Sequence, residues 1–143
     1  MPVGRAALCA VSTVAAVFVG VAAGQSSHSG ADFVSPGCRT AVHARACGVA
    51  VQYLAALDLD RADDACGLLD PGTLQAAGGL GACKRALLLA RGIRIRYRVS
   101  AVAQSPLGTT VRFSTRADGR QWLRQQMLVS HAGRIVAIVF ERW

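Results

Sequence analysis

The stretch Val49–Ala90, VAVQYLAALDLDRADDACGLLDPGTLQAAGGLGACKRALLLA, decides the fold of this chain. Its apolar residues recur at three- and four-residue spacing, which predicts the end of one long helix, two short helical pieces and a fourth helix. The long helix is expected to span about Thr40–Leu57. Two of the later helices each carry a cysteine on their apolar stripe; the stripes are Ala62, Cys66 and Leu69, and Leu80, Cys83, Leu87 and Ala90.

From Ile93 onward the apolar period changes from about 3.6 to 2, as in strands with one solvated face. Three further strands are expected at Thr109–Thr115, Gln121–Ser130 and Arg134–Trp143, separated by turn sequences. The last strand, RIVAIVFERW, is apolar on both faces and is expected to be central or covered. We therefore expect an α+β fold, with N-terminal helices packed on one face of a four-stranded antiparallel sheet.

The N-terminus has the layout of a secretory signal peptide. One positive charge at Arg5 precedes the apolar run Leu8–Ala23, and Ala22 and Gly24 suit the two small positions before a cleavage site. An uncleaved anchor is the alternative, because the run is nearly long enough to span a bilayer, although it is only mildly apolar. We expect a leader at residues 1–24, a polar linker at 25–37 and the folded domain at 38–143, secreted or held at the cell envelope.

The cysteine count supports export. Removal of the leader takes Cys9 with it and leaves four cysteines, which suits a disulfide framework with three possible pairings. We favour Cys66–Cys83 together with Cys38–Cys47. The second pair requires the first helix to start after Cys38, because nine residues along one straight helix would separate the two cysteines by about 13 Å. Zinc is the alternative, but no Cys-x-x-Cys pair is present and the spacings suit no common zinc site. No metal site or cofactor is predicted.

The aspartates of DLDRADD, residues 58–64, invite a calcium interpretation that the spacing does not support. The positions that a calcium loop reserves for glycine and glutamate hold Asp63 and Leu69. Asp60 is instead expected to cap the next helix, with Asp63 and Asp64 in the first turn, where the helix dipole favours negative charge.

The net charge of +8 lies mainly in the C-terminal half, where twelve basic residues from residue 84 onward face two acids. Such a half favours anionic partners. Alternation places Arg94, Arg96 and Arg98 about 7 Å apart on one strand face, and Arg112 and Arg124 can join them from neighbouring strands. This face is a candidate site for an anionic polymer, a lipid or a partner protein; alternatively, it only keeps the sheet soluble. Nucleic acid is not expected as a partner, since few aromatic residues interleave with the arginines.

The sequence combines a helix ending in YLAAL, a short acidic link, the motif ACGLLDP, and the motif GAC ahead of four strands. On these features the chain resembles small secreted actinobacterial proteins of the nuclear-transport-factor-2-like (cystatin-like cone) superfamily. The resemblance covers about residues 40–143. It implies a curved, cone-like sheet that wraps a long helix around a cavity. Members include enzymes, which place an acid and a histidine inside the cone, and non-catalytic envelope accessories.

The sequence itself offers little for catalysis. His43 is expected at the edge of the first helix and His131 in a turn, and alternation gives no inward acid apart from Glu141. We therefore expect an exported, disulfide-stapled, non-catalytic binding or accessory module of the cell envelope. Its expected partner is an envelope protein or an anionic polymer, with membrane anchoring through the N-terminal segment as a further possibility. The alternative is a small-molecule pocket enzyme, isomerase- or cyclase-like.

Overall fold

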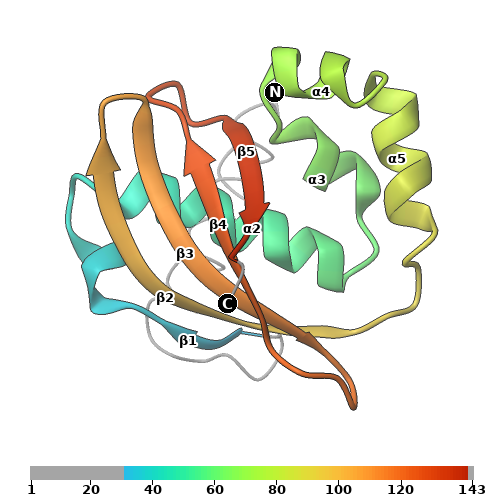
Figure 1. Cartoon of the computed structure of the whole chain (residues 1–143), viewed down its shortest axis with the longest axis horizontal. Coiled ribbons are helices and arrows are strands. Elements are labelled where there is room, and N and C mark those ends of the chain that lie inside the picture. The colour runs from blue at the N-terminus through green and yellow to red at the C-terminus, as the bar shows by residue number, and fades with distance from the viewer. Residues whose placement is uncertain (1–30, 142–143) are drawn as a thin grey trace, which may run out of the picture.

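The computed structural model describes residues 31–141, and the predicted leader lies outside this range. The described chain is an α+β domain, which confirms the predicted class, and helices precede most of the sheet (Figure 1). In order, the elements are β1 (Ala31–Val34), the 3₁₀ helix η2 (Pro36–Arg39), α2 (Ala44–Asp58), α3 (Ala62–Gly67), α4 (Pro71–Ala76), α5 (Leu80–Leu88), β2 (Ile95–Ser105), β3 (Gly108–Ala117), β4 (Leu123–Val129) and β5 (Ile135–Phe140).

The sheet has five strands in the order β1-β2-β3-β4-β5, so the expectation of four antiparallel strands is wrong. The additional strand, β1, lies within the stretch expected to be linker and pairs in parallel with β2. The remaining neighbours pair antiparallel, as predicted. Strand β1 has only four residues and follows polar, glycine-containing sequence, and so short a segment carries too little alternation to predict a strand.

The core lies between α2 and one face of the sheet. Small residues of α2, among them Ala46 and Ala50, let the helix approach the strands closely, and Leu54 fills the centre. Across from them the strands contribute Tyr97, Val99, Val111, Phe113, Met127, Val129 and Ile135, all buried. Helix α2 begins at Ala44 rather than at Thr40, because the backbone N–H and the hydroxyl of Thr40 both donate to Gly37 O and close η2 ahead of the helix.

Strand β5 is the edge of the sheet, so the prediction that it is central or covered is wrong. Only its first part is shielded. Ile135 exchanges backbone hydrogen bonds with Leu68 and Asp70, and Thr73 Oγ1 donates to Val136 O at 2.7 Å. Beyond this point the strand is open, and the side chain of Phe140 is 66% exposed. The apolar residues on both faces of β5 therefore belong to an edge strand that is partly open to solvent.

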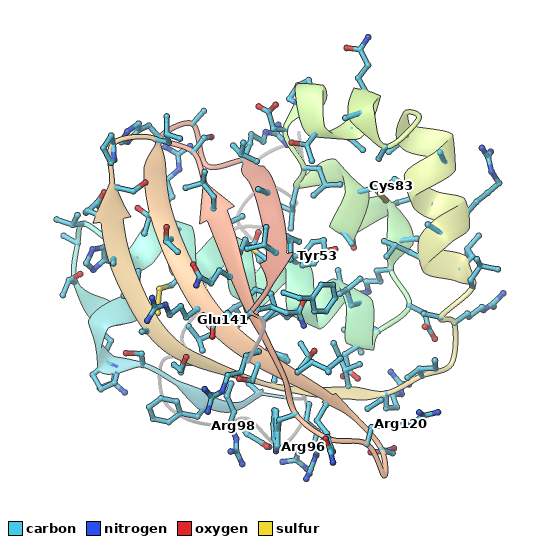
Figure 2. All side chains as sticks on the ribbon, in the orientation of Figure 1. Tyr53, Cys83, Arg96, Arg98, Arg120 and Glu141 are labelled. Carbon is cyan, nitrogen blue, oxygen red and sulfur yellow. A yellow bond between two sulfur atoms is a disulfide. The ribbon has the colours of Figure 1, made fainter. Side chains whose placement is uncertain are left out.

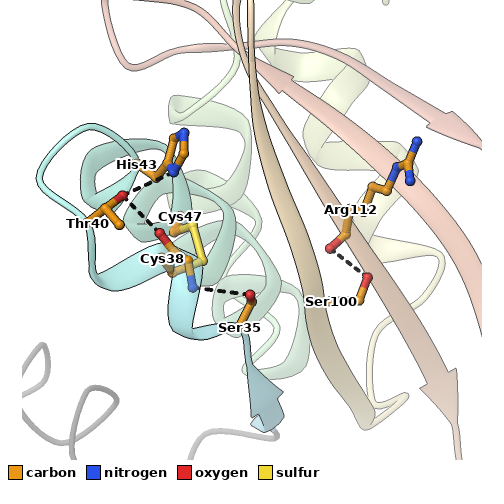
Figure 3. The surroundings of a disulfide bond; sticks show 8 residues. Ser35, Cys38, Thr40, His43, Cys47, Ser100 and Arg112 are labelled. Atoms are coloured by element: carbon orange, nitrogen blue, oxygen red, sulfur yellow. Dashed lines mark hydrogen bonds between the residues drawn. A yellow bond between two sulfur atoms is a disulfide. The ribbon is translucent and has the colours of Figure 1, made fainter.

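Two disulfides join the pairs that the sequence favours. Cys38 and Cys47 connect η2 to α2 with Cα atoms 5.5 Å apart (Figure 3). Cys66 and Cys83 connect α3 to α5 with Cα atoms 6.1 Å apart. The first pairing is possible because Cys38 lies in η2, outside α2, which avoids the long separation along one helix.

Helices α3, α4 and α5 lie beside β5 rather than over the sheet (Figure 1). Neither α4 nor α5 contains a buried residue. Of the stripe predicted in α5, Cys83 and Leu87 are half-buried, whereas Leu80 and Ala90 are exposed. The stripe prediction is therefore correct for only part of α5, because this helix packs on α3 instead of on the sheet.

Asp60 does not cap α3, contrary to expectation. Arg61 occupies the N-cap position, and its side chain makes no capping hydrogen bond. Asp60 adopts a positive φ of 56°, a conformation that aspartate tolerates better than most residues. Its carboxylate accepts from Gly92 N at 3.0 and 3.1 Å, which ties the α5–β2 connection to the end of α2. Within the described residues, no helix is long and apolar enough to cross a membrane.

Candidate functional site

The five arginines expected on one strand face do not all share it. Arg94 lies just before β2, and its Nη1 donates to the carbonyl of Asp58 at the C-terminus of α2. The last carbonyls of a helix lack intrahelical donors and carry partial negative charge, so they attract a guanidinium. Arg94 therefore closes a helix end and does not extend the basic face. The Asp58 carboxylate accepts from Ile95 N at 2.9 Å in the same region.

Arg96 and Arg98 remain on the outer face of the sheet, the face opposite α2, and both point away from the ribbon (Figure 2). Both are paired with Asp32 of β1. Arg96 Nε donates to Asp32 Oδ1 at 2.6 Å, and Arg98 Nε lies 3.7 Å from Asp32 Oδ2. The carboxylate is largely shielded, whereas the two guanidinium groups are about half exposed. Asp32 thus reduces the positive charge of this pair without hiding it.

An aromatic side chain completes this group. The guanidinium carbon of Arg98 lies 4.1 Å from the ring centroid of Trp122, and that of Arg116 lies 5.0 Å from it. Both distances fall within the range of cation–π attraction. Arg116 is directly opposite Arg96 in the β2–β3 ladder, so two like charges are held side by side.

The remaining two predicted arginines lie further along the same face. Arg112 Nε is 3.6 Å from Glu141 Oε1, the oxygen that also accepts from Gln126 Nε2 at 2.8 Å. Arg124 lies opposite Ser114, the residue that also faces Arg98, so it shares the outer face. Among residues 31–141, five arginines (Arg96, Arg98, Arg112, Arg116 and Arg124) accompany two carboxylates (Asp32 and Glu141) on this face, an excess of three positive charges.

The sequence interpretation missed Asp32, Arg116 and Trp122. Alternation along Arg112–Arg116 contained the signal for Arg116, because every second residue of a strand shares a face. Trp122 immediately precedes β4, and only its contact with the arginines reveals its place. No sequence pattern indicated that Asp32 would join this face, because β1 is too short to be predicted as a strand and lies in the stretch expected to be linker.

A second candidate is a partly open cavity of about 210 Å³ between the C-terminal half of α2, α5 and the inner face of the sheet. Most of its lining is apolar. Helix side chains such as Leu57 and Leu87 face Phe113 and Ile138 of the sheet. Apolar surface also extends beyond the mouth, since Leu123 and Phe140 are the ladder partners of the lining residues Thr115 and Gln125 and are themselves exposed.

Among the described residues, the polar lining of the cavity comprises three half-buried residues, Tyr53, Thr115 and Gln125, and three exposed charged residues, Asp60, Arg61 and Arg91. Burial raises the pKa of the Tyr53 phenol above its ordinary value, because the charged form loses hydration, so Tyr53 is a neutral hydroxyl across the physiological range. Figure 2 shows Tyr53 between the sheet and the helices beside β5. Gln125 Nε2 donates to Thr115 Oγ1 at 2.8 Å, which fixes the amide on the opposite wall. A neutral hydroxyl and a fixed amide can orient a ligand but do not form an acid–base pair.

The groups considered for catalysis lie elsewhere. His43 is at the start of α2 beside the Cys38–Cys47 disulfide, with its Nδ1 3.1 Å from Thr40 Oγ1 (Figure 3). His131 is in the β4–β5 turn, and Glu141 is held on the outer face. None of these three residues lines the cavity. Asp60 does line it, but both of its carboxylate oxygens accept from Gly92 N.

Comparisons with known proteins find likeness among solved structures. No protein-family model and no curated protein matches the sequence. Among solved structures, the chain is similar to an NTF2-like protein of unknown function from Cytophaga hutchinsonii, with a TM-score of 0.45 and 13% sequence identity over 72% of this chain and 94% of that one.

Proposed function

We propose that this chain is an exported, disulfide-stapled, non-catalytic binding module of the cell envelope, and that it holds a small apolar ligand in the cavity between α2, α5 and the sheet. The observation that carries the proposal is the lining of that cavity: mostly apolar walls with one neutral phenol and one oriented amide, while its charged residues (Asp60, Arg61 and Arg91) are exposed. Binding sites commonly combine apolar walls with a few fixed polar groups.

Export is supported by the leader-like N-terminus and by the two disulfides, which persist in oxidising compartments. A non-catalytic role is supported by the positions of His43, His131 and Glu141, none of which meets another reactive group in the cavity. An isomerase- or cyclase-like enzyme needs a base within hydrogen-bonding reach of its substrate. The one carboxylate among the described lining residues, Asp60, is exposed and is held by Gly92 N.

The size of the cavity limits the ligand. A volume of about 210 Å³ lies between the roughly 150 Å³ cavity that admits benzene and the roughly 300 Å³ at which drug-sized pockets begin. The fitting ligand is therefore a single ring with a short substituent or the end of an acyl chain. One polar atom of that ligand would lie near Tyr53 or Gln125.

The test is binding of toluene, a single ring with a short substituent, followed by isothermal titration calorimetry. The wild-type domain should bind it saturably, and Ala90→Trp should abolish binding, because Ala90 lines the cavity and is exposed enough to accept a larger side chain. Ala86→Trp is the matched control, since Ala86 is an exposed residue of α5 outside the lining. Equal toluene binding by wild type and Ala90→Trp would refute the cavity as the binding site.

A further inference from the structure

We propose that the outer face of the sheet binds the anionic headgroups of a phospholipid membrane, with Arg96, Arg98 and Arg116 holding phosphates and Trp122 and Phe33 lying at the level of the headgroups. This surface lies on the opposite side of the sheet from the cavity. The proposal therefore does not depend on the cavity holding a ligand.

The charge of the face favours an anionic partner. Two of its three excess positive charges are concentrated around Asp32, because Arg96 and Arg116 oppose each other in the ladder and Arg98 shares Trp122 with Arg116. Like charges placed directly opposite on a sheet repel each other, and an arriving phosphate relieves that repulsion. A face that needed only solubility could interleave acids at these positions.

The aromatic groups favour a membrane over a soluble polyanion. Phe33 lies opposite Arg98 in the β1–β2 ladder and is 49% exposed, and Trp122 contacts the same arginine. Val139, the ladder partner of Gln126, is a second exposed apolar side chain on the face, and Trp122 is half-buried. A soluble polyanion gains little from exposed apolar groups, whereas tryptophan and other apolar side chains enter the membrane–water interface beside cations.

Asp32 regulates the strength of this surface. Its carboxylate lies between Arg96 and Arg98 and competes with a lipid phosphate for both guanidinium groups. Asp32→Asn should therefore tighten binding to anionic vesicles several-fold. Asp63→Asn is the matched control, because Asp63 is likewise paired with one exposed cation, Lys84, but on the helical side of the molecule.

Co-sedimentation with vesicles of phosphatidylglycerol and phosphatidylcholine, compared with phosphatidylcholine alone, tests the proposal on the exported protein. Each basic residue near an anionic membrane contributes about fivefold to binding, so Arg96→Gln with Arg98→Gln should weaken it roughly 25-fold. Lys84→Gln with Arg85→Gln removes the same charge from α5 and should change it far less. Circular dichroism verifies that each variant is folded, and binding should fall steeply with salt.

Tryptophan fluorescence distinguishes a membrane from a soluble polyanion. The chain has two tryptophans, so the measurement uses Trp143→Phe, in which Trp122 is the sole emitter. Its emission should shift to the blue on phosphatidylglycerol vesicles. The proposal would be overturned if the protein showed no preference for anionic vesicles, or if the two double variants weakened binding equally. It would also be overturned if vesicle binding caused no blue shift and long-chain polyphosphate competed with the vesicles, which would indicate a soluble polyanion as the partner.

Discussion

Removal of the Cys66–Cys83 disulfide should release α5 before the rest of the domain unfolds. Helix α5 contains no buried residue, so little apolar packing holds it in place. Its other attachments are weak: the Lys84–Asp63 ion pair is exposed, with 77% of the Asp63 side chain accessible. Exposed ion pairs contribute little to stability. The disulfide is therefore the principal tie between α5 and the buried end of α3, where Cys66 is fully buried.

The expected magnitude follows from loop closure. The bridge spans 17 residues, and the chain-entropy model assigns such a loop about 3 kcal/mol. The double variant Cys66→Ala with Cys83→Ala should lose about this much free energy of unfolding and melt on the order of 10 °C lower. If the variant loses this free energy in a local opening of α5, the amides of α5 should exchange roughly 100-fold faster.

Hydrogen exchange read by mass spectrometry locates the loss. Amides of Leu80–Leu88 should lose most of their protection in the double variant through local opening. Amides of β3, which open only on global unfolding, should lose no more protection than the fall in global stability allows. Cys38→Ala with Cys47→Ala is the comparison; its loop of nine residues is worth about 2.6 kcal/mol and lies away from α5. Unchanged protection of Leu80–Leu88 in the first variant would show that packing, not the disulfide, holds α5, and would refute this reasoning.

Three further outcomes are expected. The pKa of Tyr53 is raised in the folded state, so as pH rises above the ordinary tyrosine pKa of about 10 the phenol ionises first in the unfolded chain. The free energy of unfolding should therefore fall as pH rises from about 10 toward the folded pKa. Tyr53→Phe should reduce this pH dependence in denaturant titrations, and an unchanged pH dependence would contradict the assignment. Asp58→Ala should cost about 1–3 kcal/mol in the same assay, because it leaves Ile95 N without its acceptor, whereas Asp58→Asn, which keeps an oxygen there, should cost less. Secreted protein should begin near Gln25, and N-terminal sequencing that starts at Met1 would indicate an anchor instead.

The candidate surfaces illustrate how far local pattern extends. Alternation correctly placed Arg96 and Arg98 on a solvated face, because side chains of a strand point to opposite faces at a fixed period. It could not show that Arg94 would turn to the end of α2, since that contact joins residues 36 apart in the sequence. Nor could it supply Asp32, which reaches Arg96 from a strand 64 residues earlier. The cavity likewise combines α2, α5 and four strands, and no single stretch of sequence outlines it.

By itself the sequence determined most of the helical and extended segments and the α+β class, because hydrophobic period is a local property. It favoured the two observed cysteine pairs among three possible pairings. Only the tertiary structure decided that β1 joins the sheet in parallel, that β5 lies at an open edge and that α5 stands beside the sheet. These features depend on pairing and packing between distant segments, where several arrangements satisfy the same local pattern. The apolar run of β5 fits a central strand and an edge strand equally well, and the neighbours alone choose between them.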